Sequence, residues 1–147
     1  MDCSWNPLTA LDVTNNINLL YLDCKIAELT TLDVSNNTVL RELSCGSNRL
    51  TALDVSNNTA LTGLNCVYNL LSTLDVSYNT ALTTIDVRSN GLTTLDISMN
   101  TALIHLYISQ MPSLGQVCVW DIPFPPAGVD VDTTDSPNVY FTTDCSK

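Results

Sequence analysis

The sequence predicts a mainly β fold in which the chain winds into a solenoid of about five coils, with few or no helices. Two interleaved repeats and the lack of a helical pattern support this prediction. The triplet Leu-Asp-Val or Leu-Asp-Ile recurs with a 21-residue step, starting at Leu11, Leu32, Leu53, Leu74 and Leu95. A second series with the same 21-residue step starts at Leu22, Leu43, Leu64, Ile85 and Leu106. No segment shows the apolar period of an amphipathic helix.

Each copy of either series is a short stretch of alternating apolar and polar residues, which is typical of a strand with one buried face. A single coil cannot bury its own leucines, so successive coils must stack at about the 4.8 Å spacing of neighbouring strands. The inward leucines and valines would then form one continuous core.

Asparagine recurs at two places in the coil. One column contains Asn16, Asn37, Asn58, Asn79 and Asn100. The other contains Asn6, Asn48, Asn69 and Asn90 and is interrupted by Ala27 and Met111. An inward amide at a tight turn can bond backbone groups that the bend leaves unpaired, so both columns are predicted to serve the turns.

The composition limits the classes of partner. The chain has 147 residues, which suits one domain, and its 15 acidic and 5 basic residues give a net charge of −10. Such an acidic surface repels phosphate, which argues against nucleic acids and anionic membranes as partners. No apolar run approaches the roughly 20 residues of a membrane span, so membrane insertion is not expected.

The start of the sequence lacks the basic region and apolar run of a signal peptide. Met1 stands at the position that Leu22 occupies in the next coil, so the chain is expected to begin inside a strand. We therefore expect that N-terminal coils and a signal peptide are missing from this chain. An uncapped end of this kind could also pair with another copy.

Residues 61–70, with the sequence Leu-Thr-Gly-Leu-Asn-Cys-Val-Tyr-Asn-Leu, resemble the Leu-x-x-Leu-x-Leu-x-x-Asn-x-Leu signature of leucine-rich repeats. The Leu-Asp-Val-Ser-x-Asn-Thr-Ala-Leu segment between copies resembles a variant found in secreted and surface proteins of Bacteroidota. The resemblance covers residues 1–112, the predicted solenoid. It implies that the second series forms a concave, ligand-binding sheet.

Residues 113–147 are predicted to be a C-terminal capping segment, because prolines and aromatics replace leucines there. The end of a solenoid exposes core leucines and strand edges that something must cover. The side chains expected to do so are Trp120, Phe124, Tyr140 and Phe141. The family resemblance implies a disulfide between Cys118 and Cys145, which would place the protein in an oxidising, extracellular setting.

The other cysteines, Cys3, Cys24, Cys45 and Cys66, share the 21-residue period and therefore one inward column. We predict free thiols that pack as small apolar groups. Disulfides between adjacent coils are conceivable by distance, but strand geometry would strain them. A straight column cannot surround zinc tetrahedrally, which argues against a metal site.

Comparison of the repeats separates constant from variable columns. The second series varies at its outward positions, where tyrosines, small polar residues and charges of both signs alternate. This composition suits protein or glycan contacts. The predicted ligand-binding residues are Tyr21, Glu42, Tyr68, Asp86, Arg88, His105 and Tyr107.

The first series is nearly constant and places Asp12, Asp33, Asp54, Asp75 and Asp96 in one row. Either each carboxylate accepts bonds from nearby Ser, Thr or backbone N–H groups, or the row collects cations such as calcium. The weak metal candidates are Asp33, Asp54 and Asp75, although no glycine-rich calcium loop accompanies them. Threonine columns on the same side raise ice binding as a further alternative.

An enzyme is not predicted, and neither is a cofactor. His105 is the only histidine, and no nucleophile elbow, metal-ligand spacing or phosphate loop accompanies it. The sequence instead predicts a non-catalytic recognition module of a secreted or cell-surface bacterial protein, with a protein or glycan ligand. The alternatives are a structural spacer without its own ligand, or a cation- or ice-binding surface on the Asp/Thr side.

Overall fold

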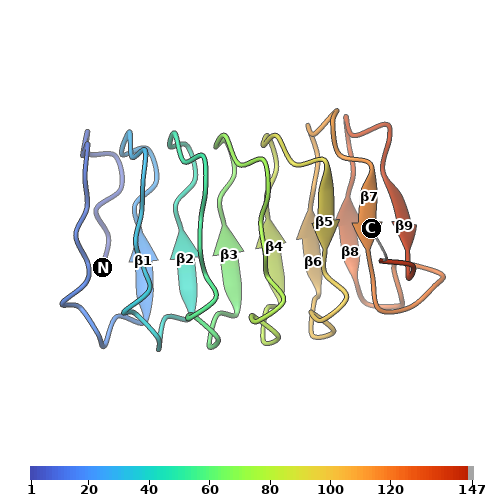
Figure 1. Ribbon diagram of the computed structural model, residues 1–147, viewed down its shortest axis with the longest axis horizontal. Helices are drawn as coiled ribbons and strands as arrows, with labels where there is room; N and C mark the ends of the chain where they lie inside the picture. Colours follow the sequence, from blue (N-terminus) through green and yellow to red (C-terminus); the bar gives the residue numbers. More distant parts are fainter. Residues whose placement is uncertain (146–147) are drawn as a thin grey trace.

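The computed structural model describes residues 1–145 and shows a β-solenoid of about six turns (Figure 1). Its larger sheet has the order β1-β2-β3-β4-β6-β8, and every pairing is parallel. The strands of this sheet are β1 (Tyr21–Asp23), β2 (Glu42–Ser44), β3 (Gly63–Asn65), β4 (Thr84–Asp86), β6 (His105–Tyr107) and β8 (Asp130–Asp132). No helix occurs in this described part of the chain, which confirms the predicted fold class.

The register of the larger sheet follows the sequence repeat. Leu22 pairs with Leu43, and Leu43 pairs with Leu64, so each step is one 21-residue coil. The central residue of each strand points inward and is almost fully buried, as Leu43, Ile85 and Leu106 illustrate. These residues form the continuous core that the repeat predicts.

The smaller sheet lies on the Leu-Asp-Val side and has the order β5-β7-β9. Its strands are β5 (Thr94–Asp96), β7 (Gln116–Cys118) and β9 (Tyr140–Thr142). The expectation of a strand in every copy of this series is therefore wrong for the copies at Leu11, Leu32 and Leu53. The copy at Leu74 contributes only an isolated bridge between Asp75 and Asp96. The Asp side chain bonds the N–H two residues on in every coil, including Asp96 within β5, so this local turn does not by itself account for the missing strands.

The segment after residue 112 continues both sheets. Strand β8 pairs with β6, while β7 and β9 extend the smaller sheet, giving about six turns where the repeat count predicts five. The division at residue 112 and the capping role of 113–147 stay predictions. Residues 146 and 147 of that segment lie outside the described residues.

Aromatic side chains pack at the C-terminal end of the core. Trp120, Phe124 and Phe141 contact the core residues, with the Phe124 ring 5.2 Å from Trp120 and 4.8 Å from Phe141. Tyr140 was expected to join them, but 55% of its surface is exposed. Phe141 takes the inward position of β9, so its neighbour Tyr140 must point outward.

The cysteines divide as the sequence predicts. Cys118 and Cys145 form a disulfide, with their Cα atoms 5.7 Å apart. The four repeat cysteines are free: Cys24, Cys45 and Cys66 are buried, and Cys3 is half-buried at the first coil. Burial raises the pKa of the Cys24 and Cys66 thiols to about 12.

The first asparagine column bonds successive coils to one another. Asn58 is fully buried and its Nδ2 donates to the carbonyls of Val34 and Asn37, each at 2.9 Å. Asn37, Asn79 and Asn100 make the equivalent pair of bonds one coil earlier or later. The predicted role of this column in the turns is confirmed.

The side chains of the second asparagine column both donate and accept hydrogen bonds. Asn48 Nδ2 donates to the Cys24 and Cys45 carbonyls, and its Oδ1 accepts from the Leu29 N–H at 2.9 Å. Ser136 continues this column after the interruption at Met111: its hydroxyl donates to the Ile108 carbonyl and accepts from the Met111 N–H. A left-handed residue precedes each position of the column: Trp5, Ile26, Ser47, Tyr68, Ser89, Gln110 and Asp135.

Replacement of Asn58 by alanine should strongly destabilise the solenoid. The change removes one of two donors from each of the Val34 and Asn37 carbonyls, which keep the backbone N–H groups of Asn37 and Leu40, and the loss of two buried hydrogen bonds costs about 1–3 kcal/mol in total. Urea unfolding followed by circular dichroism measures the difference. The matched control is Asn57→Ala, because Asn57 is exposed and makes one long bond to Ser35. Equal stability of the two variants would contradict the role given to the buried amides.

The rate of thiol alkylation should differ between the repeat cysteines according to their burial. In the folded protein, iodoacetamide is expected to modify Cys3 well before Cys24, Cys45 and Cys66, which are buried and carry raised thiol pKa values. In urea all four should react. Peptide mass spectrometry at timed intervals checks the order, and modification of Cys45 as fast as Cys3 would contradict the packing.

Candidate functional site

We define the variable face as the outward first and third residues of the larger sheet together with the second residue after each strand. The first positions are Tyr21, Glu42, Gly63, Thr84, His105 and Asp130, and the third positions are Asp23, Ser44, Asn65, Asp86, Tyr107 and Asp132. The residues after the strands are Lys25, Gly46, Val67, Arg88, Ser109 and Thr134. The parallel register places each set in a row across the sheet.

The structure divides the predicted contact residues into separate groups. Asp86, Arg88, His105 and Tyr107 come together on β4 and β6 and the turn that follows β4. Tyr21 and Glu42 lie toward the other end of the sheet, on β1 and β2. Tyr68 lies on the turn after β3, beside the face. Their contact with a ligand stays a prediction.

The group on β4 and β6 is held in one arrangement by its own contacts. Arg88 donates from Nε and a terminal nitrogen to the two oxygens of Asp86, at 2.8 and 2.7 Å. Its guanidinium lies 5.3 Å from the centre of the Tyr107 ring, and Tyr107 lies parallel to His105 at 6.1 Å. Hydrogen bonding to Asp86 raises the pKa of Arg88. The result is a preformed row of stacked side chains.

Asp86 has a supporting position in this row. Only 5% of its surface is exposed, because Arg88 covers its carboxylate. A bidentate bond of this kind restrains the guanidinium over the ring. We therefore assign Asp86 to positioning Arg88, while Arg88 and Tyr107 offer the accessible surface.

Gln110 ties Tyr68 to the same end of the face, and sequence reasoning missed it. Its Oε1 accepts from the Tyr68 hydroxyl at 3.2 Å and from the Ser89 hydroxyl at 2.7 Å. These residues occupy the left-handed turn position of three successive coils. The 21-residue step from Tyr68 to Ser89 to Gln110 was the signal that could have found it.

Asp130 and Asp132 extend the face onto β8 and were also missed as site residues. Asp130 Oδ2 lies 3.7 Å from His105 Nδ1, a contact that becomes an ion pair only when the imidazole is protonated. Bonds from the Thr134 N–H and hydroxyl lower the pKa of Asp132, with a smaller contribution from Arg88. The alternation Asp-Val-Asp was the available signal, but it comes 25 residues after β6 and not 21.

At the other end of the face, Glu42 lies over Gly63. A side chain at Gly63 would collide with the Glu42 carboxylate, so glycine leaves the space that the carboxylate fills. The Thr62 hydroxyl donates to Glu42 Oε1 at 3.0 Å. On the first strand, Lys25 and Asp23 form an ion pair at 3.0 Å.

In the row of aspartates on the opposite side of the solenoid, the carboxylates accept hydrogen bonds from nearby backbone N–H and hydroxyl groups, which is the structural role considered for them. In each coil the carboxylate accepts from the N–H two residues on at 2.9 Å, as Asp33 does from Ser35 and Asp54 from Ser56. Asp12 also accepts from the Thr14 hydroxyl at 2.6 Å. Metal binding by Asp33, Asp54 and Asp75 stays a prediction.

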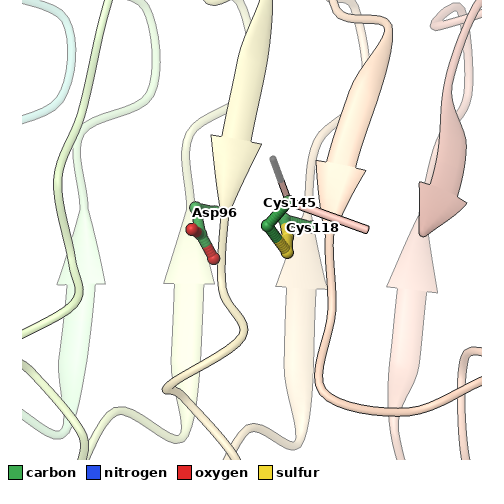
Figure 2. Close-up of side chains that lie close together, drawn as sticks. All are labelled: Asp96, Cys118 and Cys145. Atoms are coloured by element: carbon green, nitrogen blue, oxygen red, sulfur yellow. A yellow bond between two sulfur atoms is a disulfide. The ribbon is translucent and has the colours of Figure 1, made fainter. Parts of the chain in front are cut away.

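Asp96, Cys118 and Cys145 lie together at the smaller sheet, and Figure 2 shows the Asp96 carboxylate beside the two sulfurs. A hollow of about 400 Å³ lined by Thr94, Asp96 and Gln116 adjoins them. The sulfurs are bonded to each other, so they cannot act as the thiolate ligands that a metal centre of this type requires. We assign this group to joining the last described residues to β7.

Several solved structures share this overall fold. The functional domain of InlJ from Listeria monocytogenes superposes with a TM-score of 0.83 and 34% identity, over 91% of this chain and 29% of that one. That structure includes a cysteine ladder, and this chain has its own column of four free cysteines. The chain has the fold of a leucine-rich repeat solenoid.

Two further structures share the leucine-rich repeat fold at lower identity. A leucine-rich repeat protein of Leptospira interrogans matches with a TM-score of 0.64 and 20% identity, over 93% of this chain and 40% of that one. The internalin InlF of Listeria monocytogenes matches with a TM-score of 0.66 and 23% identity, over 81% and 36%. This chain thus spans between 29% and 40% of these structures.

A comparison with protein-family models found no match, and a search of curated proteins found none either. The specific resemblance to repeats of Bacteroidota stays a prediction. Among the described residues, the structure has no helix that is long and apolar enough to cross a membrane.

The aspartate row predicts a loss of stability in acid. Hydroxyl and backbone N–H groups hold the pKa of Asp12, Asp33 and Asp54 below the ordinary 3.8. A carboxylate with a lowered pKa in the folded state stabilises the fold above its unfolded pKa and loses that contribution as pH falls through the folded pKa. The urea midpoint should therefore hold between about pH 7 and 5 and fall below about pH 4.

A triple variant tests the origin of this acid effect. Asp12→Asn, Asp33→Asn and Asp54→Asn keep an oxygen acceptor at each position but remove the titrating group. The midpoint of this variant should fall less than that of the parent between about pH 5 and 2.5. An equal fall would mean that other carboxylates cause the acid sensitivity.

Proposed function

We propose that this leucine-rich repeat chain is a non-catalytic protein-recognition module of a secreted or cell-surface bacterial protein, and that it binds its partner through the variable face. The observation that carries the proposal is the preformed row of Arg88, Tyr107 and His105 on an exposed sheet. Binding hot spots are rich in Tyr and Arg, and side chains that are already ordered lose little entropy on binding.

The contrast between the two sides of the solenoid supports this face over the other. The asparagine and leucine columns repeat in nearly every coil and are buried, so they maintain the stack. The variable face changes from Tyr21 to Glu42 to Gly63 along one row, although the backbone beneath it stays the same. Differences of this kind suit recognition of one partner.

A surface or secreted location has separate support. The Cys118–Cys145 disulfide is typical of proteins that fold in oxidising surroundings. The similarity to InlJ and InlF extends the proposal to a bacterial interaction module, because internalins and this chain share the same solenoid. A glycan ligand is the alternative that the same face allows.

A tyrosine variant tests the proposed face. Tyr21→Ser, Tyr68→Ser and Tyr107→Ser together should reduce affinity for a protein partner at least about tenfold, because they remove the ring contacts of the face. The chain and variant would be compared by surface plasmon resonance on a panel of purified extracellular proteins and a glycan array.

The matched control replaces tyrosines elsewhere. Tyr78 and Tyr140 are 60% and 55% exposed, close to the 55% and 56% of Tyr21 and Tyr68, but lie off the variable face. Tyr78→Ser and Tyr140→Ser should leave binding unchanged. Equal losses in both variants would reject the face, ligands confined to the glycan array would reject a protein partner, and no binding at all would favour the structural spacer.

A further inference from the structure

We infer that the variable face takes an extended protein segment rich in arginine and lysine, lying across the strands from Glu42 to Asp130 and Asp132. This inference rests on the proposed function and specifies the chemistry of the partner. The charges of the face, the position of its glycine and the order of the strands support it.

The cations of the variable face are already neutralised. Lys25 is paired with Asp23 at 3.0 Å, and Arg88 is paired with Asp86 at 2.7 Å. Both pairs form between residues of the same coil, and toward the neighbouring coil Arg88 makes only a smaller contribution to lowering the pKa of Asp132. The face therefore has no spare cation for an acidic partner.

The remaining carboxylates of the face have no such partner among the described residues. Glu42 accepts only a hydroxyl bond from Thr62, and Asp132 accepts the Thr134 N–H at 3.0 Å. Asp130 faces His105, which contributes a charge only when protonated. The net charge of the variable face is therefore negative, like the net charge of −10 of the whole chain, and this field would attract a basic partner from a distance.

The space between these carboxylates is suited to a segment lying flat on the sheet. Gly63 carries no side chain, and Glu42 bends over it, which places the carboxylate above the sheet interior. The next residue in the row is the small Thr84, followed by His105 and the adjacent Tyr107 ring. An arginine of the partner could stack on this aromatic pair while it bonds Asp130 or Asp132.

The strand order gives the spacing of the partner's cations. Glu42 lies on β2 and Asp130 on β8, with β3, β4 and β6 between them. Because the Glu42 carboxylate lies over Gly63 on β3, the charges are three strand steps apart, roughly 14 Å at about 4.8 Å per strand, and an extended chain covers that distance in about four residues. A basic segment with cations about four residues apart would therefore reach both ends.

The aspartate row on the other side is a weaker candidate for the same partner. Each of its carboxylates is engaged by the N–H two residues on, as Asp33 is by Ser35, but Asp132 of the variable face is engaged by Thr134 in the same way, so this bond does not separate the two sides. The columns of this row contain only Asp and Ser or Thr, so they offer no ring beside the charges. The row supplies the same kind of charge and thus a control of equal size.

The test compares triple variants that remove equal charge from opposite sides. One carries Glu42→Gln, Asp130→Asn and Asp132→Asn on the variable face. The other carries Asp12→Asn, Asp33→Asn and Asp54→Asn on the aspartate row. The probe is a fluorescein-labelled twelve-residue peptide in which arginines alternate with serines, and fluorescence anisotropy at low salt measures its affinity.

We expect the variable-face variant to lose about tenfold or more in affinity and the aspartate-row variant to lose less than about threefold. A peptide with glutamate in place of arginine should not bind. Equal losses in the two variants would show attraction by net charge alone, and a larger loss in the aspartate-row variant would place the basic segment on the other side. Either result overturns the inference.

Failure of this inference can be told apart from failure of the proposed function. If the arginine peptide does not bind but a protein partner is lost with the tyrosine variant, the face recognises proteins and the basic chemistry is wrong. If the carboxylate variant binds the peptide as the parent does and the tyrosine variant keeps its affinity for the protein partner, both are wrong. Thermal melts of all variants confirm that losses reflect binding and not unfolding.

Discussion

The structure depends on the requirement that each coil satisfy the buried backbone groups of its neighbour. At every turn, carbonyl groups point into the stack where water cannot reach them. The amides of Asn37, Asn58, Asn79 and Asn100 donate to these carbonyls from the adjacent coil. Since the loss of a buried hydrogen bond is costly, one coil cannot change its turn without penalising the next. This constraint keeps the period at 21 residues through most of the chain.

The same constraint explains how the fold separates the residues that maintain the stack from those that are free to vary. Inward positions keep residues of similar character from coil to coil, because each side chain meets its equivalent one coil away; Val87 and Ile108 are buried where earlier coils have thiols. Outward residues of the larger sheet meet only neighbouring side chains and solvent, so Tyr21, Gly63 and His105 can occupy one row without disturbing the backbone. The solenoid thus gives a rigid surface whose composition is free to change, which is the property that a recognition module needs.

Sequence reasoning succeeded where the repeat is regular and failed where it is not. The Leu-Asn-Cys copy at Leu64 and the buried Asn58 follow from the period alone. Asp130 and Asp132 were missed because the last step is 25 residues, which hides their alignment with His105. Ser136 was missed because a hydroxyl there replaces an amide, and only the positions of Ile108 and Met111 reveal it.

The contacts between side chains also could not be predicted from the sequence. The identities of Asp86 and Arg88 suggest an ion pair, but not that Asp86 would be buried beneath it or that Arg88 would lie over Tyr107. Such contacts depend on rotamers that neighbouring coils select. The absence of a sheet ladder at Leu11, Leu32 and Leu53 likewise cannot be predicted from the pattern, because the equivalent triplet at Leu95 does lie in a strand, β5.

The side chains of the variable face are not needed to hold the stack together, and thermal unfolding of a multiple variant tests this. A variant with serine at Tyr21, Glu42, Thr84 and His105 removes four outward side chains from one row at once. The account predicts a melting temperature within about 4 °C of the parent, equivalent to about 1 kcal/mol for a domain of this size. A fall of more than about 10 °C would contradict the account, because these side chains would then be holding the stack together.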